Sequence, residues 1–265
     1  MTTTPTRPHS LLPHEHGAWG QLALPMASAL ALGGLAPAAL LLAAATVLGF
    51  LAHEPWLVLL GHRGARALAD DGARARRFLG WLLFAATLCG AVGAWLAPWP
   101  ARLALLLPAA LAAAVIGLVL AKRERTVPGE LTVVSALATS GFAVALAGGA
   151  SLRVAAAATL TWELAFAASV FAVQGVLERA RSKEPIDSGP RNALAVALVT
   201  GLGSAAALAV GLGWVVPLAV APTALLSLAV CMGLFSPRKL RRLGWGLVGA
   251  TGVTLLVLVA LLKAS

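Results

Sequence analysis

The pair His53-Glu54, followed by Pro55, places an imidazole and a carboxylate inside an apolar stretch of the chain. Glu54 lies nine residues before Arg63, which on helical geometry puts the carboxylate roughly 13 Å from the polar end of that stretch. Because an ionisable side chain at membrane depth is costly, it usually faces a bundle interior or a wet cavity. Glu54 is therefore a candidate ligand-binding group, and a buried ion pair with an Arg or a His is the alternative.

A second polar cluster comes directly before the first apolar stretch, in the sequence Pro13-His14-Glu15-His16-Gly17-Ala18-Trp19. Its imidazoles could act as general bases or as metal ligands, since histidine titrates near neutral pH and is a common ligand. An interfacial anchor, with Trp19 at the depth of the lipid head groups, is the alternative. A helix would not place the two imidazoles on one face, so a metal or haem site requires the tail to fold back toward His53, Glu54 and His62.

The third cluster lies at the end of another apolar stretch, where Gln174, Glu178 and Arg181 share a helical face by their spacing of four and three. Arg179 follows directly after the carboxylate. As at the first cluster, a carboxylate stands among cations, which suits the binding of a phosphate through a metal or through arginine. Glu163 lies in the same stretch, roughly 22 Å away along the helix, and stays outside this hypothesis.

These clusters are positioned by apolar segments that alternate with short polar gaps. The chain of 265 residues is 60% apolar and only 11% charged, a composition that excludes a soluble globular domain. Each segment is close to the ~20 residues that a helix needs to cross hydrocarbon. We predict an all-α fold, in which a polar tail at 1–16 precedes a single transmembrane helical domain at 17–265. The expected spans number about nine and are roughly 17–36, 36–60, 78–97, 103–121, 131–149, 154–177, 192–212, 214–235 and 244–262.

Basic residues are distributed asymmetrically between these segments. All but three of the 20 Lys and Arg residues lie in the N-terminal tail or in the gaps after the second, fourth, sixth and eighth segments. Because positive charge marks the cytoplasmic side, we predict a multi-pass protein of the inner (cytoplasmic) membrane, with its N-terminus in the cytoplasm and its C-terminus outside. The net charge of +10 is explained by contact with anionic lipid, so no nucleic-acid partner is expected.

The small residues Gly141, Ala145 and Gly149 recur at a spacing of four. They are predicted to form a helix face that lets two backbones approach closely, because small residues dominate such contacts in membranes. Cys89 and Cys231 lie inside apolar segments and are not part of a CxxC motif. We expect them to pack as small apolar side chains and to form neither a disulfide nor a metal site.

The N-terminal cluster, the Leu24-Pro25 pair in the first span and the Glu54-Pro55 pair late in the second resemble the YwiC-like family of bacterial membrane proteins. The layout of the whole chain also resembles the UbiA superfamily of intramembrane prenyltransferases. That resemblance implies an isoprenyl diphosphate held by Mg²⁺ between acidic motifs at the cytoplasmic ends of helices 2 and 6. At these positions the chain has single glutamates, Glu54 and Glu178, in place of paired aspartates.

Three functions remain open at this stage, and the first is a divergent UbiA-like enzyme that binds an isoprenyl diphosphate in a cytoplasm-facing cavity. Its metal ligands, for Mg²⁺, would be Glu54 and Glu178. Its substrate-binding residues would be Trp19, Arg63, Gln174, Arg179 and Arg181. The general base would be one of His14, His16 and His53.

The second function is the binding or transport of a metal or haem through the N-terminal and second-span histidines. The third is a noncatalytic membrane assembly factor, in which the polar clusters are internal ion pairs. Membrane lipids are expected partners in every case. An isoprenoid or other lipid-like substrate belongs to the first function only.

Overall fold

The computed structural model describes residues 10–13, 16–181, 189–234 and 240–264, and every regular element within these ranges is an α-helix. The all-α fold is therefore confirmed. Two of the helices, α4 and α5, are separated only by Leu105 and act as one crossing. The helices are α1 (His16–Gly33), α2 (Pro37–Leu59), α3 (Ala65–Leu96), α4 (Trp99–Ala104), α5 (Leu106–Leu120), α6 (Val127–Gly148), α7 (Leu152–Arg181), α8 (Gly189–Ala209), α9 (Val215–Cys231) and α10 (Leu240–Ala264).

Within the described ranges, seven helical segments are long and apolar enough to cross a membrane. They are α2, α3, α4 with α5, α6, α7, α8 and α10. The two remaining segments of the predicted layout are α1, with 18 residues, and α9, with 17. The chain is a multi-pass integral membrane protein, because only helices that satisfy their own backbone groups can fill a bilayer in this way.

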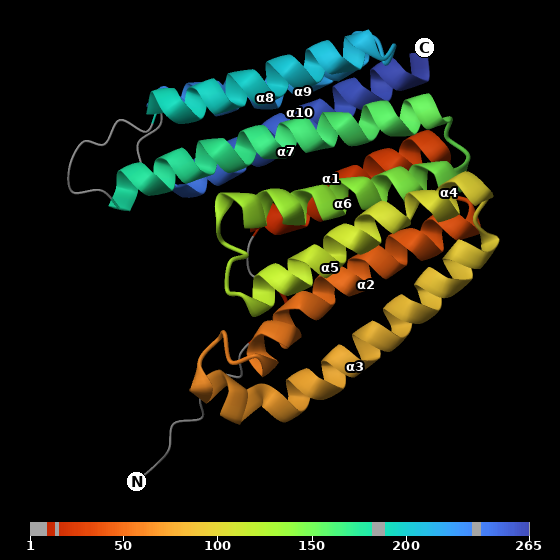
Figure 1. The fold of residues 1–265 in the computed structure, drawn as a ribbon, viewed down its shortest axis with the longest axis vertical. Helices are drawn as coiled ribbons and strands as arrows, with labels where there is room; N and C mark the ends of the chain where they lie inside the picture. Colours follow the sequence, from red (N-terminus) through yellow and green to blue (C-terminus); the bar gives the residue numbers. More distant parts are fainter. Residues whose placement is uncertain (1–9, 14–15, 182–188, 235–239, 265) are drawn as a thin grey trace.

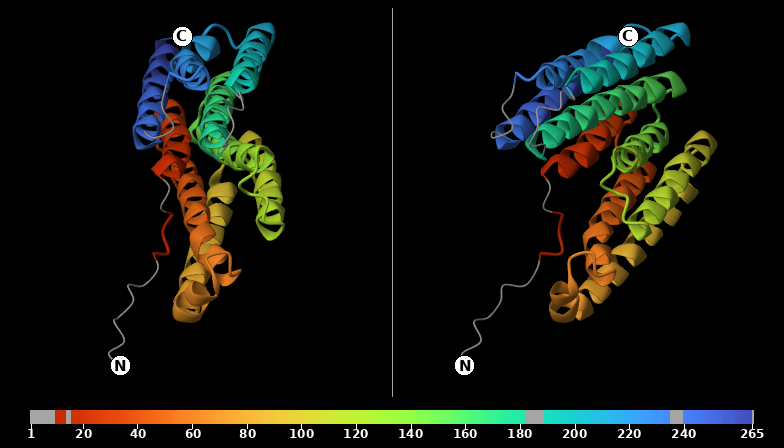
Figure 2. Two further views of the ribbon diagram at one scale, coloured as in Figure 1. Left: turned by 90° about the vertical axis from the view of Figure 1, so that its left-hand side faces the viewer. Right: turned by 60° about the vertical axis from the view of Figure 1, so that its left-hand side comes forward.

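α1, α6 and α7 form the middle of the bundle (Figure 1). α1 packs against α6, α7 and α10, and α6 also packs against α2, α5 and α7. α8, α9 and α10 lie on one side of this centre, whereas α2, α3 and α5 lie on the other (Figures 1 and 2). In the part of the chain that the structure describes, α3 packs extensively only against α2, so most of its apolar surface faces outward.

A close backbone contact joins α1 to α6. A Cβ atom added at Gly33 would lie 2.4 Å from the carbonyl oxygen of Ala145, and one added at Gly149 would lie 3.6 Å from the carbonyl oxygen of Gly33. Further along, a Cβ at Gly141 would contact Pro25 at 3.3 Å. The predicted small-residue face is therefore confirmed, and it brings the two central helices together at backbone distance.

The helix α3 is longer than the predicted span, because it takes in most of the preceding polar gap. Its 32 residues measure about 48 Å, against ~30 Å of hydrocarbon. The first part of the helix carries ion pairs between Arg66 and Asp70 at 3.7 Å and between Arg74 and Asp71 at 3.1 Å. We conclude that this part extends beyond the apolar layer, with oppositely charged side chains paired at helical spacing.

One end of the bundle is where α2, α5, α7 and α9 finish, and each of these helices is followed in the sequence by a basic connection. We call it the basic end. α1 and α10 both begin there, and α10 finishes at the opposite end (Figure 1). The first and last helices therefore place the two termini of the bundle on opposite sides, as an odd number of crossings requires.

Exposed tryptophans mark two levels along the bundle. Trp245 lies early in α10, which starts at the basic end, and Trp81 lies halfway along α3, beyond the charged first part of that helix. Trp95, Trp99 and Trp214 lie near the other end. The exposed fractions of these tryptophans run from 59% to 79%. On α3 the two levels are about 21 Å apart, from the helical rise over 14 residues. Tryptophans at two such levels are typical of the two membrane–water interfaces.

Candidate functional site

A cavity of about 1460 Å³ lies among α2, α5, α6 and α7, with contributions from α1, α3 and α10. Its lining is mostly Ala, Val, Leu and Gly, so its walls are predominantly apolar. Pockets for drug-sized ligands enclose about 300–1,000 Å³. The cavity therefore has room for a long apolar chain.

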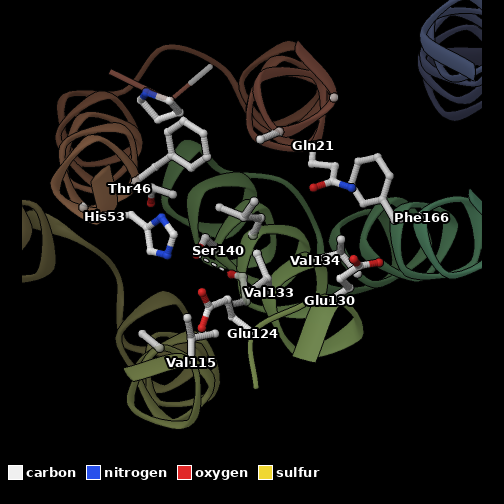
Figure 3. A pocket seen from close by; sticks show the side chains of 18 of the residues that line it. Gln21, Thr46, His53, Val115, Glu124, Glu130, Val133, Val134, Ser140 and Phe166 are labelled. Carbon is white, nitrogen blue, oxygen red and sulfur yellow. Dashed lines mark hydrogen bonds between the residues drawn. The ribbon is translucent and has the colours of Figure 1, made fainter. Parts of the chain in front are cut away.

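Polar side chains gather in the part of the cavity nearest the basic end. In Figure 3, His53 of α2 and Glu124, from the connection between α5 and α6, point toward the same space, while Gln21 and Glu130 lie beside Phe166. The walls further from this end are mainly apolar and carry no charged side chain, although the hydroxyls of Thr46, Ser140, Ser169 and Thr251 also line the cavity. The cavity is thus polar at one end and mainly apolar along the rest, which is the shape of an amphiphile. The polar lining residues of this end are Gln21, His53, Glu54, Arg63, Glu124, Arg125, Glu130 and Gln174.

Glu54 is engaged by Arg63 in a bidentate ion pair. Arg63 donates from Nε to Oε1 at 2.7 Å and from Nη2 to Oε2 at 2.5 Å. The carboxylate side chain is 2% exposed and the guanidinium 27%. The chain reverses after α2 through Gly61 and Gly64, both at positive φ, which side chains with a Cβ rarely adopt. This turn brings Arg63 back over the last residues of α2, and the buried-pair alternative for Glu54 is what the structure shows.

Glu178 and Arg179 face away from the cavity, although Gln174 one turn earlier lines it. Arg191 of α8 donates from Nη2 to both carboxylate oxygens of Glu178 at 2.9 Å. Arg179 donates to the carbonyl oxygens of Val230 and Cys231 at 2.8 Å each, at the end of α9. These two side chains therefore connect α7 to its neighbours α8 and α9, and a cation at a helix C-terminus is favourable.

The chain before α1 passes along the polar end of the cavity. Leu11 is buried against Val58 of α2, and Pro13 lines the cavity. Trp19 donates from its indole nitrogen to the carbonyl oxygen of Pro13 at 3.1 Å and meets Phe50 edge-on at 5.4 Å. This segment does lie against α2, as a metal site would need. Trp19 itself is fixed by these contacts beside the cavity wall.

Several of the predicted site residues lie outside the described part of the chain. They are His14 and the side chains of His16 and Arg181. Their roles as general base and as substrate contact stay predictions. His53 is the one histidine of the predicted catalytic set whose side chain is described, and it lines the cavity.

The described residues give no support to the magnesium site that the UbiA resemblance implies. Among them, no group of three or more His, Cys, Asp or Glu could hold a metal ion. Both oxygens of Glu54 and of Glu178 accept hydrogen bonds from arginine, and only the first of these glutamates lines the cavity. Among the described residues, the ligands that would hold a diphosphate through Mg²⁺ are not brought together, and the binding of Mg²⁺, of another metal or of haem stays a prediction.

Two acidic residues of the cavity, Glu124 and Glu130, were absent from the predicted site. Glu130 lies in the first turn of α6, where a carboxylate is favourable. Thr126 caps the same helix, because its hydroxyl oxygen accepts a hydrogen bond from the backbone N–H of Gly129 at 3.2 Å. Glu124 is the one acid in the basic run from Lys122 to Arg125. That lone negative charge among cations was the signal available in the sequence.

Glu163, which lies outside the predicted site, accepts a hydrogen bond from Ser135 at 2.6 Å. Ser135 belongs to α6 and Glu163 to α7, so the contact joins two central helices. Glu163 is not among the residues that line the cavity. The pair therefore accounts for this carboxylate without a ligand.

Fold and cavity together define a polytopic helical membrane protein with an amphiphile-shaped internal cavity. The model of a family described as YwiC-like protein matches residues 12–145, about half of the chain. The chain belongs to this YwiC-like family. The matched part contains α1 to most of α6, with Glu54, Arg63 and Glu124. Comparison with curated proteins and with solved structures found no match in either set.

Proposed function

We propose that this YwiC-like membrane protein binds an isoprenoid or another lipid-like molecule in the cavity. The observation that carries the proposal is the form of the cavity, which is about 1460 Å³ in volume and has charged side chains only toward the basic end. An apolar chain would lie along α5 and α6, past Ala109, Ala112 and Val144, and its head group would lie near His53 and Glu124. Burial of such a chain is favourable in proportion to the apolar surface removed from water.

The arrangement of α5 supports entry of the ligand from the bilayer. Among the described helices, α5 packs against α6 and α4, and neither α2 nor α3 is one of its extensive contacts. The cavity nevertheless has walls from α2, α3 and α5, so it separates α5 from the other two. A lipid-like molecule could reach the cavity between them without crossing water.

The proposal includes a UbiA-like layout with the basic end in the cytoplasm, which the charge asymmetry supports. In a UbiA-like enzyme the bound molecule would be the isoprenoid substrate. His53 lines the polar end and is the described group suited to act there as a general base.

Two alanines on α5 provide a matched test. Ala112 lines the cavity, whereas Ala113 is exposed on the same helix and does not line it. In detergent-purified full-length protein, Ala112→Phe should lower the affinity for a tritiated long-chain isoprenoid by about tenfold or more, equal to ~1.4 kcal/mol. Ala113→Phe should leave the affinity unchanged. Equal binding by both variants and the unmodified protein would overturn the proposal.

A second candidate, the noncatalytic assembly factor, is favoured by one observation. Glu54 and Glu178, the two carboxylates expected to hold a metal, are both paired with arginines from the same chain. If folded protein binds no isoprenoid, this function takes precedence. Crosslinking of the protein to neighbours in native membranes then becomes the measurement.

A further inference from the structure

Among the described residues that line the cavity, four carry hydroxyl groups, and each donates its proton to a carbonyl oxygen of its own helix. The distances are 3.0 Å from Thr46 to Leu42, 2.7 Å from Ser140 to Ala136, 2.9 Å from Ser169 to Ala165 and 2.9 Å from Thr251 to Leu247. A hydroxyl has one donor hydrogen and two acceptor lone pairs. These four side chains therefore leave only acceptors for a ligand in the cavity.

The charged groups give the wall the same bias. Three carboxylates line the described cavity, those of Glu54, Glu124 and Glu130, against the two guanidiniums of Arg63 and Arg125. An ionised carboxylate only accepts hydrogen bonds. Arg63 already directs Nε and Nη2 to Glu54. The described wall therefore has one carboxylate more than it has guanidiniums.

Glu124 adds a buried acceptor that has no partner. Its Oε2 atom is buried and makes no hydrogen bond to any described residue. A buried polar atom without a partner is costly, and a donor on a ligand would remove that cost after a small movement of the side chain. In Figure 3 the Glu124 carboxylate lies at the polar end, where it points toward the same space as His53.

From this wall we infer that the ligand carries a neutral head group with a hydroxyl donor, either an alcohol or a phenol, and that a diphosphate is disfavoured. A diphosphate is an anion, so it would be repelled by the carboxylates of the polar end, which outnumber the guanidiniums there by three to two. A hydroxyl would donate to Glu124 or to a wall hydroxyl. The inference rests on the proposed function, because it names the head group of the molecule bound there.

The test compares two ligands with the same apolar chain, geranylgeraniol and geranylgeranyl diphosphate, on purified full-length protein with and without Mg²⁺. We expect the alcohol to bind about tenfold tighter, and Mg²⁺ not to reverse the order. A diphosphate that binds as tightly as the alcohol, or more tightly, in either condition would overturn the inference.

Variants identify the groups responsible. Glu124→Gln replaces one acceptor oxygen by a donor, so it should weaken binding of the alcohol about five- to tenfold and reduce the preference over the diphosphate. Glu178→Gln, outside the cavity, is the matched control and should change neither. Ser140→Ala removes an uncharged acceptor, the hydroxyl of Ser140. This variant takes the place of Glu124→Gln if Glu124→Gln does not fold. Unchanged alcohol binding in folded Glu124→Gln and Ser140→Ala would refute the assignment.

The Ala112→Phe variant separates this inference from the proposed function. If neither ligand binds, or if Ala112→Phe reduces binding of neither, the cavity is not the site and both proposals fall. If both ligands bind, Ala112→Phe weakens both, and the diphosphate is equal or preferred, the proposed function stands and the head-group inference alone falls.

Discussion

Glu54→Gln is the substitution whose effect on stability follows most directly from the structure. It removes the charge of a side chain that is 2% exposed and with it the bidentate ion pair to Arg63. Breaking a buried ion pair in this way costs about 3–5 kcal/mol. Because Arg63 is 27% exposed and lies toward the basic end, it can be partly solvated again. We therefore expect a loss near the lower limit, about 3 kcal/mol.

The same substitution at Glu178 is the matched control. There the pair with Arg191 has side chains 40% and 70% exposed, and pairs of that kind contribute about 0–1 kcal/mol. Both variants should be compared by unfolding in mixed micelles of detergent and dodecyl sulfate, with the free energy of unfolding obtained from the transition. A double variant, Glu54→Gln with Arg63→Gln, should recover part of the loss because both charges of the pair are then absent.

The reasoning fails if Glu54→Gln costs less than about 1 kcal/mol, the range of an exposed pair. It also fails if the two single variants are equally destabilised. The two ion pairs differ mainly in burial. Equal effects would therefore mean that burial does not determine how much the Glu54 pair contributes to stability.

Two other predictions concern helix packing and topology. Gly33→Ala should lower the free energy of unfolding by about 1–3 kcal/mol, because its Cβ would lie 2.4 Å from the Ala145 carbonyl oxygen. Gly20→Ala, in the same helix with nothing within 4 Å, should stabilise by about 0.5–1 kcal/mol in the same assay; destabilisation of similar size in both would contradict the close contact. An alkaline phosphatase fused after Ala264 should be active in intact cells, because that enzyme folds outside the cytoplasm; activity only of a fluorescent protein fused there would reverse the topology.

The fold could be predicted from the sequence because the membrane restricts backbone structure so strongly. Apolar segments of the right length must be helices, and the asymmetry of positive charge sets their orientation across the membrane. The small-residue face with Gly141 and Ala145 could also be predicted, because only small residues allow two helix backbones to come into contact in a membrane. The extension of α3 back to Arg66 and Asp70 was harder to predict. Hydropathy marks only the part of a helix that lies in the apolar layer, and a helix can continue beyond it.

The candidate site was predicted only in part, because tertiary packing decides which way each polar group faces. Glu54 and Arg63 were found from their spacing, and the turn at Gly61 and Gly64 completes the pair. Spacing alone could not show that Glu178 pairs with α8 and lies outside the cavity. Nor could it show that the connection holding Glu124 turns inward. That turn depends on Gly129, where a Cβ would lie 2.4 Å and 2.7 Å from the carbonyl oxygens of Arg123 and Glu124.

The ion pair of Glu54 and the acceptors of the cavity lead to separable consequences. Because Arg63 neutralises Glu54, the pair adds no net charge to the polar end, and recognition of a head group falls to the remaining acceptors, Glu124 among them. Loss of the pair should therefore change stability more than head-group preference, whereas Glu124→Gln should change preference more than stability. If both substitutions altered stability alone, the polar clusters would be structural and the assembly-factor function would follow. A change of preference at Glu124 with folding intact requires a ligand in the cavity.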